Sequence, residues 1–196
     1  MNHLFDTCTI IHAISDEEEI ERIANHCCSL GDKFSISDEI LKELKPPKSL
    51  SDEDCETNTL YSYIKLFIAA GKINLIDCCQ NAEIKSNLND IRDRYYKWMG
   101  NPKFCKELIS QGKLTLEEYR SPNFRYKDIG ECTLIAIALV DPTSNLIISE
   151  DHGAVYKFPK ENLFTHYSKF GIQIMKYGAW AKRVELPWVI KSGSTQ

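Results

Sequence analysis

The sequence predicts an α/β protein with a three-layer α/β/α fold around a central, mostly parallel five-stranded sheet. Short β-type runs alternate with helical segments, a pattern typical of parallel sheets covered by helices on both faces. The chain has 196 residues, of which 43% are hydrophobic and 27% charged, as in an ordinary globular domain with its own core. We therefore expect one domain over residues 1–190, with a helical insertion at about 80–127 and a flexible tail at 191–196.

Five short runs are the predicted strands of this sheet. Because helical segments separate them along the chain, we expect them to pair in parallel. In chain order they are "HLF" (3–5), "KFSIS" (33–37), "INLID" (73–77), "NLIISED" (145–151) and "KFGIQIM" (169–175).

The helical segments are recognised by the residues at their ends. Acidic residues, which suit the positive N-terminus of a helix, open the segment 16–30, and Gly31 ends it. Pro46 stops a short helix at 38–44, and a longer segment at 49–71 carries apolar residues at helical spacing. The remaining segments are 81–119, helical in pieces and broken around 100–102, an apolar helix at 130–142 and a final helix at 177–184.

Several classes of protein do not fit the composition. No stretch approaches the roughly 18 uncharged apolar residues of a membrane span. Asp6 and the acids at 16–19 interrupt any secretory leader pattern, so we expect a cytoplasmic protein without membrane partners. The eight cysteines include no C-x-x-C and no zinc-finger spacing, and we expect reduced, mostly buried thiols. The absence of a G-x-G-x-x-G or P-loop motif argues against a nucleotide-binding protein.

One segment has an excess of positive charge, although the net charge of the whole chain is −4. Residues 92–127 contain nine Lys or Arg and four Asp or Glu, interleaved with seven aromatic residues. Cations and rings in this arrangement suit single-stranded nucleic acid, in which they meet phosphates and bases. The alternative is a solvated helix whose rings face the core, and we expect this for most of the rings. The candidate substrate-binding residues are Arg92, Arg94 and Lys97.

Acidic and hydroxyl residues recur where the predicted strands end. Since the carboxyl ends of parallel strands meet at one edge of a sheet, these side chains are expected to converge. They are Asp6 and Thr7 after the first strand, Asp38, Glu39 and Glu43 after the second, Ser149 and Asp151 after the fourth, and Glu131 at the start of the helix leading into the fourth.

A cluster of carboxylates predicts a metal site. Like charges in proximity repel and raise one another's pKa, and a hard divalent cation such as Mg²⁺ or Mn²⁺ relieves this repulsion. The chemistry that follows is metal-assisted attack of water on a phosphodiester. The acids at this edge are therefore candidate ligands, and the hydroxyls of Thr7 and Ser149 lie beside them.

Taken singly, these acids have simpler explanations. Asp6, Asp38 and Asp151 could each cap a helix, a common role of aspartate. Glu39 is kept as a reserve ligand only, and His152 is interpreted as a helix-start residue rather than a general base. The metal hypothesis therefore depends on the joint placement of the acids.

In series, the four acidic motifs resemble those of the PIN-domain nucleases, which include the VapC-type toxins. "HLFDTCTII" supplies Asp6, "FSISDEILKEL" supplies Glu43, "IGECTLIAIAL" supplies Glu131 after Gly130, and "LIISEDHGA" supplies Ser149 and Asp151. The closing "FGIQIMKYGAW" resembles the last strand and helix of the family. Cys8 stands where Ser or Asn is more usual, and the segment 80–127 is longer than in compact toxins of this kind.

The resemblance implies a PIN-like fold and a Mg²⁺- or Mn²⁺-dependent endoribonuclease acting on single-stranded RNA, tRNA or rRNA. On this basis we predict Asp6, Glu43, Glu131 and Asp151 as catalytic metal ligands, with Thr7 and Ser149 orienting water or a carboxylate. It also implies a cognate antitoxin protein and a homodimer as partners. One alternative is a catalytically silent PIN-like module that binds RNA or another protein. A haloacid-dehalogenase-type phosphatase is disfavoured, because that family needs a second Asp where this chain has Cys8.

Overall fold

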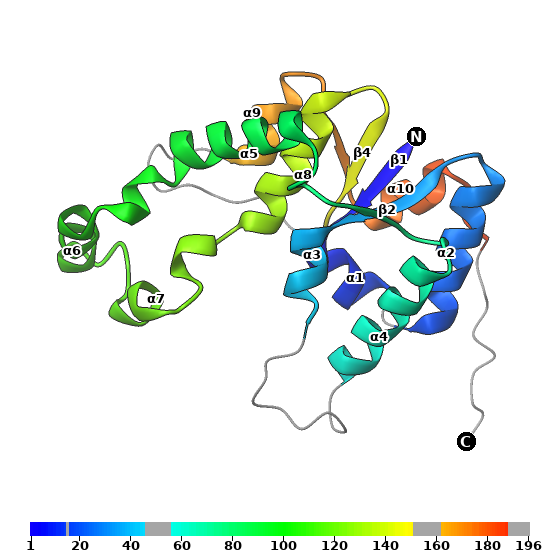
Figure 1. Ribbon diagram of the computed structural model, residues 1–196, viewed down its shortest axis with the longest axis horizontal. Coiled ribbons are helices and arrows are strands. Elements are labelled where there is room, and N and C mark those ends of the chain that lie inside the picture. Colours follow the sequence, from blue (N-terminus) through cyan, green and yellow to red (C-terminus); the bar gives the residue numbers. More distant parts are fainter. Residues whose placement is uncertain (15, 46–55, 151–161, 188–196) are drawn as a thin grey trace.

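The protein is built around a five-stranded, all-parallel sheet (Figure 1), which confirms the predicted fold class. The computed structural model describes residues 1–14, 16–45, 56–150 and 162–187, without the side chains of 56–58. The strand order is β3-β2-β1-β4-β5. The strands are β1 (Asn2–Phe5), β2 (Lys33–Ser37), β3 (Asn74–Ile76), β4 (Asn145–Ile148) and β5 (Gln173–Met175).

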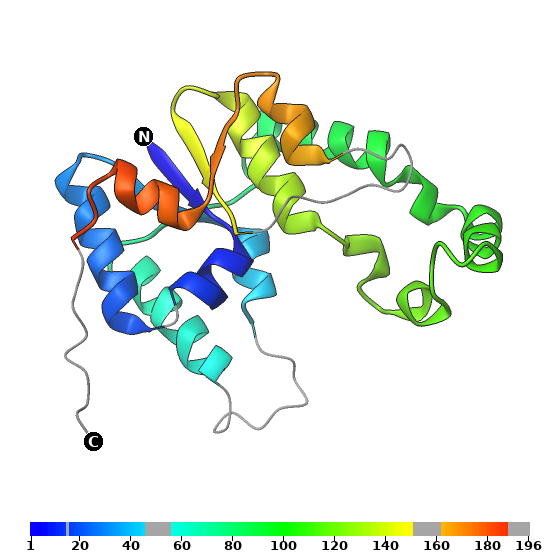
Figure 2. The same ribbon diagram turned by 180° about the vertical axis from the view of Figure 1, so that it is seen from behind.

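Helices cover both faces of the sheet (Figures 1 and 2), giving the three layers expected from the sequence. One face carries α2 (Glu17–Ser29), α4 (Glu56–Ala69) and α10 (Tyr177–Arg183). The other carries α5 (Ala82–Tyr95), α8 (Ile129–Val140) and α9 (Leu163–Ser168). Helix α8 is buried along most of its length, which explains why its sequence is apolar on every side. No helix in the described ranges is both long and apolar enough to span a bilayer.

The register of the strands aligns their carboxyl ends. Phe5 pairs with Ile148, and Ile148 pairs with Met175. The residues that follow β1 and β4 therefore leave the sheet side by side. Helices α1 (Thr7–Ala13) and α3 (Asp38–Glu43) start at this same edge, directly after β1 and β2.

The structure differs from the sequence prediction in a few element bounds. Helices α1 and α9 were not predicted. The predicted strand at 169–175 is shortened to β5, because a turn with Gly171 at φ 86° precedes it, a conformation that glycine adopts without a Cβ clash. Within the predicted helix at 49–71, the described part begins at Glu56.

The predicted helical insertion forms an arm that projects from the α/β body and curves back toward it (Figure 1). We call residues 97–128 the arm. It follows α5 and consists of η1 (Lys97–Gly100), α6 (Pro102–Ser110), α7 (Leu116–Arg120) and η2 (Phe124–Tyr126). Its last residues lead into α8.

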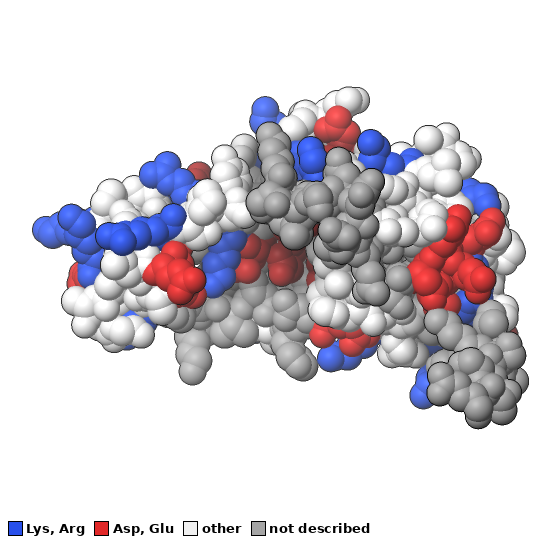
Figure 3. Space-filling view, turned by 90° about the horizontal axis from the view of Figure 1, so that it is seen from below, with Lys and Arg blue, Asp and Glu red and all other residues white. Residues whose placement is uncertain are grey.

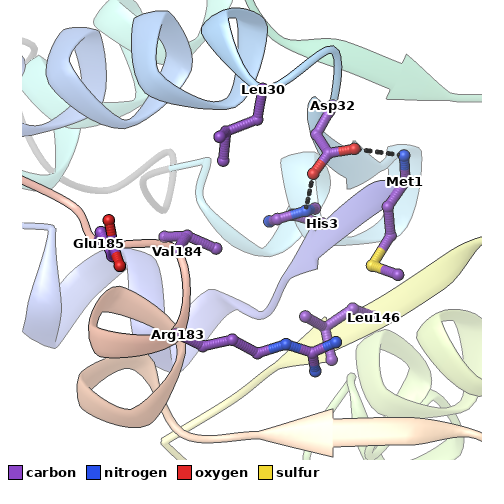
Figure 4. A pocket seen from close by; sticks show the side chains of 8 residues that line it. All are labelled: Met1, His3, Leu30, Asp32, Leu146, Arg183, Val184 and Glu185. Atoms are coloured by element: carbon purple, nitrogen blue, oxygen red, sulfur yellow. Dashed lines mark hydrogen bonds and ion pairs between the residues drawn. The ribbon is translucent and has the colours of Figure 1, made fainter.

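At the amino end of β1, a buried histidine links the sheet to α10. His3 is 1% exposed, and its Nδ1 accepts a hydrogen bond from Trp180 Nε1 at 2.6 Å. Its Nε2 lies 2.9 Å from Asp32 Oδ2 (Figure 4). The Trp180 donor requires a lone pair on Nδ1, so the neutral ring carries its proton on Nε2 and donates it to Asp32. Burial lowers the pKa of His3, although Asp32 opposes the shift. The N-terminal ammonium also pairs with Asp32, beside a cavity of about 380 Å³.

We expect His3→Ala to lower the free energy of unfolding by about 3 kcal/mol, because it opens a cavity and leaves the Trp180 N–H unpaired in the core. The exposed His12→Ala is the matched control, with an expected change within about 0.5 kcal/mol. Urea denaturation at pH 7.5 measures both values. Equal, small changes would contradict the structural role of His3.

Candidate functional site

Asp6 stands at the centre of the carboxyl edge of the sheet. It follows β1, caps α1 and is 3% exposed. Its Oδ1 accepts a hydrogen bond from the Thr7 N–H at 2.8 Å. Its Oδ2 accepts from Ser149 Oγ at 2.7 Å and from Cys8 Sγ at 2.9 Å. Because Ser149 follows β4, the neighbour of β1, the sheet itself brings these two residues together.

Glu43 reaches the same place from the end of α3. That helix is capped by Ser37, whose Oγ accepts from the Ile40 N–H at 3.1 Å. Glu43 Oε2 accepts a hydrogen bond from Thr7 Oγ1, and Oε1 accepts from the Gly130 N–H at 3.2 Å. The Glu43 carboxylate therefore bridges the first turns of α1 and α8.

Gly130 makes this bridge sterically feasible. A Cβ at residue 130 would lie 2.8 Å from each carboxylate oxygen of Glu43 and 2.9 Å from Ile40 Cδ1. These separations are shorter than van der Waals contact. The sequence marked Gly130 as the start of a helix and as part of the motif around Glu131, but it gave no sign of the contact with Glu43, since a close approach between residues 87 positions apart leaves no local signal.

Glu131 lies in the first turn of α8 and completes the cluster. Burial, followed by the negative charge of Asp6, raises the pKa of Glu131 to about 8. The pKa of Glu43 is raised by the same two causes, although this residue as a whole is exposed, because its carboxylate end is packed between α1 and α8. No Lys or Arg in the described part of the chain forms an ion pair with Glu43 or Glu131. Within the described ranges, these two acids thus have no protein cation beside them to offset their negative charge.

The raised pKa of Glu131 makes stability depend on pH. Between pH 4.5 and about 8 the folded protein holds a proton that the unfolded chain releases. The stabilisation from Glu131 is therefore complete below pH 4.5 and is lost as the pH rises through 8. We expect the Tm of the metal-free protein to fall over this range, and Mn²⁺ to restore it at the upper end by replacing the proton.

Differential scanning fluorimetry with and without Mn²⁺ measures this effect. In Glu131→Gln the pH slope of Tm is expected to flatten. If the wild type and this variant kept the same slope, the proton on Glu131 would not be its source.

Four further residues were considered at this edge of the sheet. Asp151, a predicted ligand, and His152, interpreted as a helix-start residue, lie outside the described residues. Asp38 and Glu39 form ion pairs with Lys42, at 2.9 and 2.7 Å, on the exposed side of α3.

The oxygen ligands of the cluster fit a hard cation, but their spacing is wider than that of a closed metal site. Among the described residues, only Asp38, Asp77 and Cys79 place three ligand atoms all within 4.8 Å of one another. This second group follows β2 and β3, and the same reasoning about strand ends could have found Asp77. Asp77 and Cys79 are exposed, and Asp38 is already bound by Lys42 and by the Cys78 N–H. We assign no ion to it.

The aromatic residues of the 92–127 segment are mostly packed, as the sequence suggested. Tyr95, Tyr96 and Phe124 are at most 8% exposed, and Trp98, Phe104 and Tyr119 pack against the core. Tyr126 differs, with 65% exposure.

Of the predicted substrate-binding residues, Arg94 and Lys97 are exposed, whereas Arg92 makes internal contacts. Arg92 donates hydrogen bonds to the carbonyl oxygens of Arg125 and Lys127. A view from below shows acidic side chains inside a hollow beside the arm, and Lys and Arg gathered on the arm (Figure 3).

Comparison with known proteins identifies no relative: no family model, curated protein or solved structure matches the chain. The resemblance to PIN-domain nucleases therefore rests on the sequence motifs quoted above.

Proposed function

We propose that the protein is a divalent-metal-dependent endoribonuclease of the PIN type. One observation carries the proposal: Asp6, Glu43 and Glu131 come from three separate elements to one edge of the sheet, and burial with mutual repulsion raises the pKa values of both glutamates. Carboxylates in such an arrangement are stabilised by a cation, and oxygen ligands favour Mg²⁺ or Mn²⁺.

Each residue of the cluster has a role in this proposal. Asp6, Glu131 and Glu43, together with Asp151, would hold the ion, which when bound supplies an activated water and neutralises charge on the phosphate. Ser149 and Thr7 donate hydrogen bonds to Asp6 and Glu43 and keep these carboxylates oriented.

The site also needs a surface for the RNA backbone. Exposed cations of the arm and of α5, such as Arg94 and Lys97, lie where the chain leaves the body and are suited to phosphate contacts. The net charge of the whole chain is −4, so this local excess of cations would guide RNA to the arm rather than elsewhere.

The test is cleavage of RNA by purified protein with Mn²⁺, with EDTA, and in the variant Asp6→Asn. We expect cuts that require Mn²⁺ and disappear in the variant. Sequencing of RNA after controlled expression of both forms identifies the cleaved sites. Wild-type protein that cuts no RNA in the presence of Mn²⁺ would refute the proposal.

A second candidate is a silent RNA-binding or protein-interaction module on the same fold. It is favoured by the wide spacing of the carboxylates, which in the described residues do not form a group within 4.8 Å. Its signature is RNA that is bound but never cut, with or without Mn²⁺.

A toxin role, with an antitoxin and a homodimer, is a further proposal from the PIN resemblance. A small DNA-binding protein encoded in the neighbouring reading frame would support it.

A further inference from the structure

Tyr126 is an exposed ring in a segment whose other rings are packed. It is 65% exposed, the largest fraction among the large hydrophobic residues that the structure describes. A single exposed tyrosine is common on protein surfaces and requires no explanation by itself. The way in which the surrounding backbone is held makes this one different.

The backbone on both sides of Tyr126 is fixed by one side chain. Arg92 donates to the Lys127 carbonyl oxygen at 2.7 Å and to the Arg125 carbonyl oxygen. Its guanidinium lies 3.6 Å from the centroid of the Tyr96 ring, and the Tyr96 hydroxyl donates to Asp128 Oδ2 at 3.1 Å. The ring of Tyr126 is therefore presented from a rigid turn, which reduces the entropy lost when it binds a partner.

Below this turn, Phe124 is buried and supports it. Its ring packs edge-on against Trp98 and Tyr119, at centroid distances of 6.0 and 5.5 Å. The turn thus combines a buried aromatic anchor with an exposed aromatic ring two residues later.

The surroundings of Tyr126 are basic and close to the acidic cluster along the chain. Arg125 and Lys127 flank it, and both are exposed. It lies five positions before Glu131 in the chain, so the two Cα atoms are at most about 18 Å apart. A ring between two cations, near a site for a phosphodiester, matches a nucleotide with its base and its phosphates.

We infer that Tyr126 stacks on an unpaired base of the RNA near the phosphate that is cut. The inference rests on the proposed function and names its substrate class: RNA that is single-stranded where it meets the arm. Bases inside a duplex already stack on their neighbours and do not offer a free face to a side chain. Tyrosine and arginine are also enriched at protein interfaces, whereas lysine is depleted there. The exposed Lys127 beside the ring and the acidic cluster nearby along the chain favour RNA over a protein partner.

The test measures RNA binding in the Asp6→Asn background, so that cleavage does not interfere. The probe is a single-stranded RNA carrying 2-aminopurine, whose fluorescence is quenched on stacking, with the same strand in a duplex for comparison. Tyr126→Ala is expected to weaken single-strand binding by roughly 5- to 30-fold and to abolish the quenching, because base–aromatic stacking contributes at this level. Tyr126→Phe, which keeps the ring, is expected to restore both.

Controls separate stacking from other causes. Phe170→Ala removes a ring of similar exposure, 58%, outside the arm and should leave binding unchanged. The salt dependence of binding should also be the same in Tyr126→Ala, because no phosphate contact is removed. Unchanged single-strand affinity, or an equal loss for the duplex, would overturn the inference.

The outcomes distinguish this inference from the proposed function. If wild-type protein fails to cut RNA with Mn²⁺ but Tyr126→Ala still loses the quenching, the stacking site stands and the nuclease proposal fails. If wild-type protein cuts RNA and Tyr126→Ala binds as before, the stacking site fails alone.

Discussion

Asp6→Asn is expected to lower RNA cleavage by at least about 100-fold, since even the outer partners of metal ligands contribute 10- to 100-fold. The substitution removes the negative charge of the Asp6 carboxylate from the cluster of predicted ligands. Asn caps a helix as well as Asp does. The fold should therefore persist. The oxygen of the Asn side chain can accept from the Thr7 N–H, and its NH₂ group can donate to the Ser149 hydroxyl, which accepts as well as donates.

The same variant has a second readout that does not depend on activity. Asp6 is the largest charged contribution to the raised pKa of Glu131, after burial. Removal of its charge should bring the pKa of Glu131 down from about 8, while burial keeps it above 4.5. NMR titration of the glutamate carboxyl carbons measures this shift, and calorimetry measures the parallel loss of Mn²⁺ affinity.

Asp16→Asn is the matched control for Asp6→Asn. Asp16 also caps a helix, α2, where it accepts from the Glu19 N–H at 2.8 Å, and it is not part of the acidic cluster. Cleavage and Mn²⁺ affinity should stay at the wild-type level in this variant. An equal loss of activity in the two variants would point to helix capping rather than to the charge of the cluster.

The strands were predictable because each is a short apolar run between helical segments. Sequence analysis missed α1 and α9 for a physical reason. Both are short, with seven and six residues, and neither has an acidic residue in its first turn. Their stability comes from packing, as the buried Leu163, Phe164 and Tyr167 of α9 show, and such packing is not visible in the local pattern.

In the candidate site, the residues were predictable from the sequence, but the contacts between them were not. Asp6, Glu43, Glu131 and Ser149 were predicted because parallel strands and their following helices share one edge. The contacts that hold them were not predictable. Glu43 meets Gly130 across 87 residues, and Arg92 meets Lys127 across 35, so both contacts exist only once the helices have packed. Arg92, proposed from the sequence as a phosphate ligand, is engaged with backbone carbonyls instead.

Gly130→Ala should separate the geometry of the site from its charge. The added methyl group would lie 2.8 Å from both Glu43 oxygens, so Glu43 must leave its hydrogen bonds to the Gly130 N–H and the Thr7 hydroxyl. Displacement of a ligand by about 1 Å costs on the order of 100-fold in rate, and we expect a loss of that order in cleavage and a weaker affinity for Mn²⁺. All four predicted acids remain in place in the sequence.

The effect of Gly130→Ala on stability is the sum of two opposed terms. Alanine stabilises a helix by about 1 kcal/mol over glycine, whereas the clash with Glu43 and Ile40 removes that gain. Gly178→Ala in α10 is the control, because its Cβ meets nothing within 4 Å and only the gain applies. Adding Glu43→Asp to Gly130→Ala shortens one of the two clashing side chains and should recover part of the gain in Tm without recovering cleavage. If Gly130→Ala cut RNA at the wild-type rate, the bridge from Glu43 to α8 would not be part of the active arrangement.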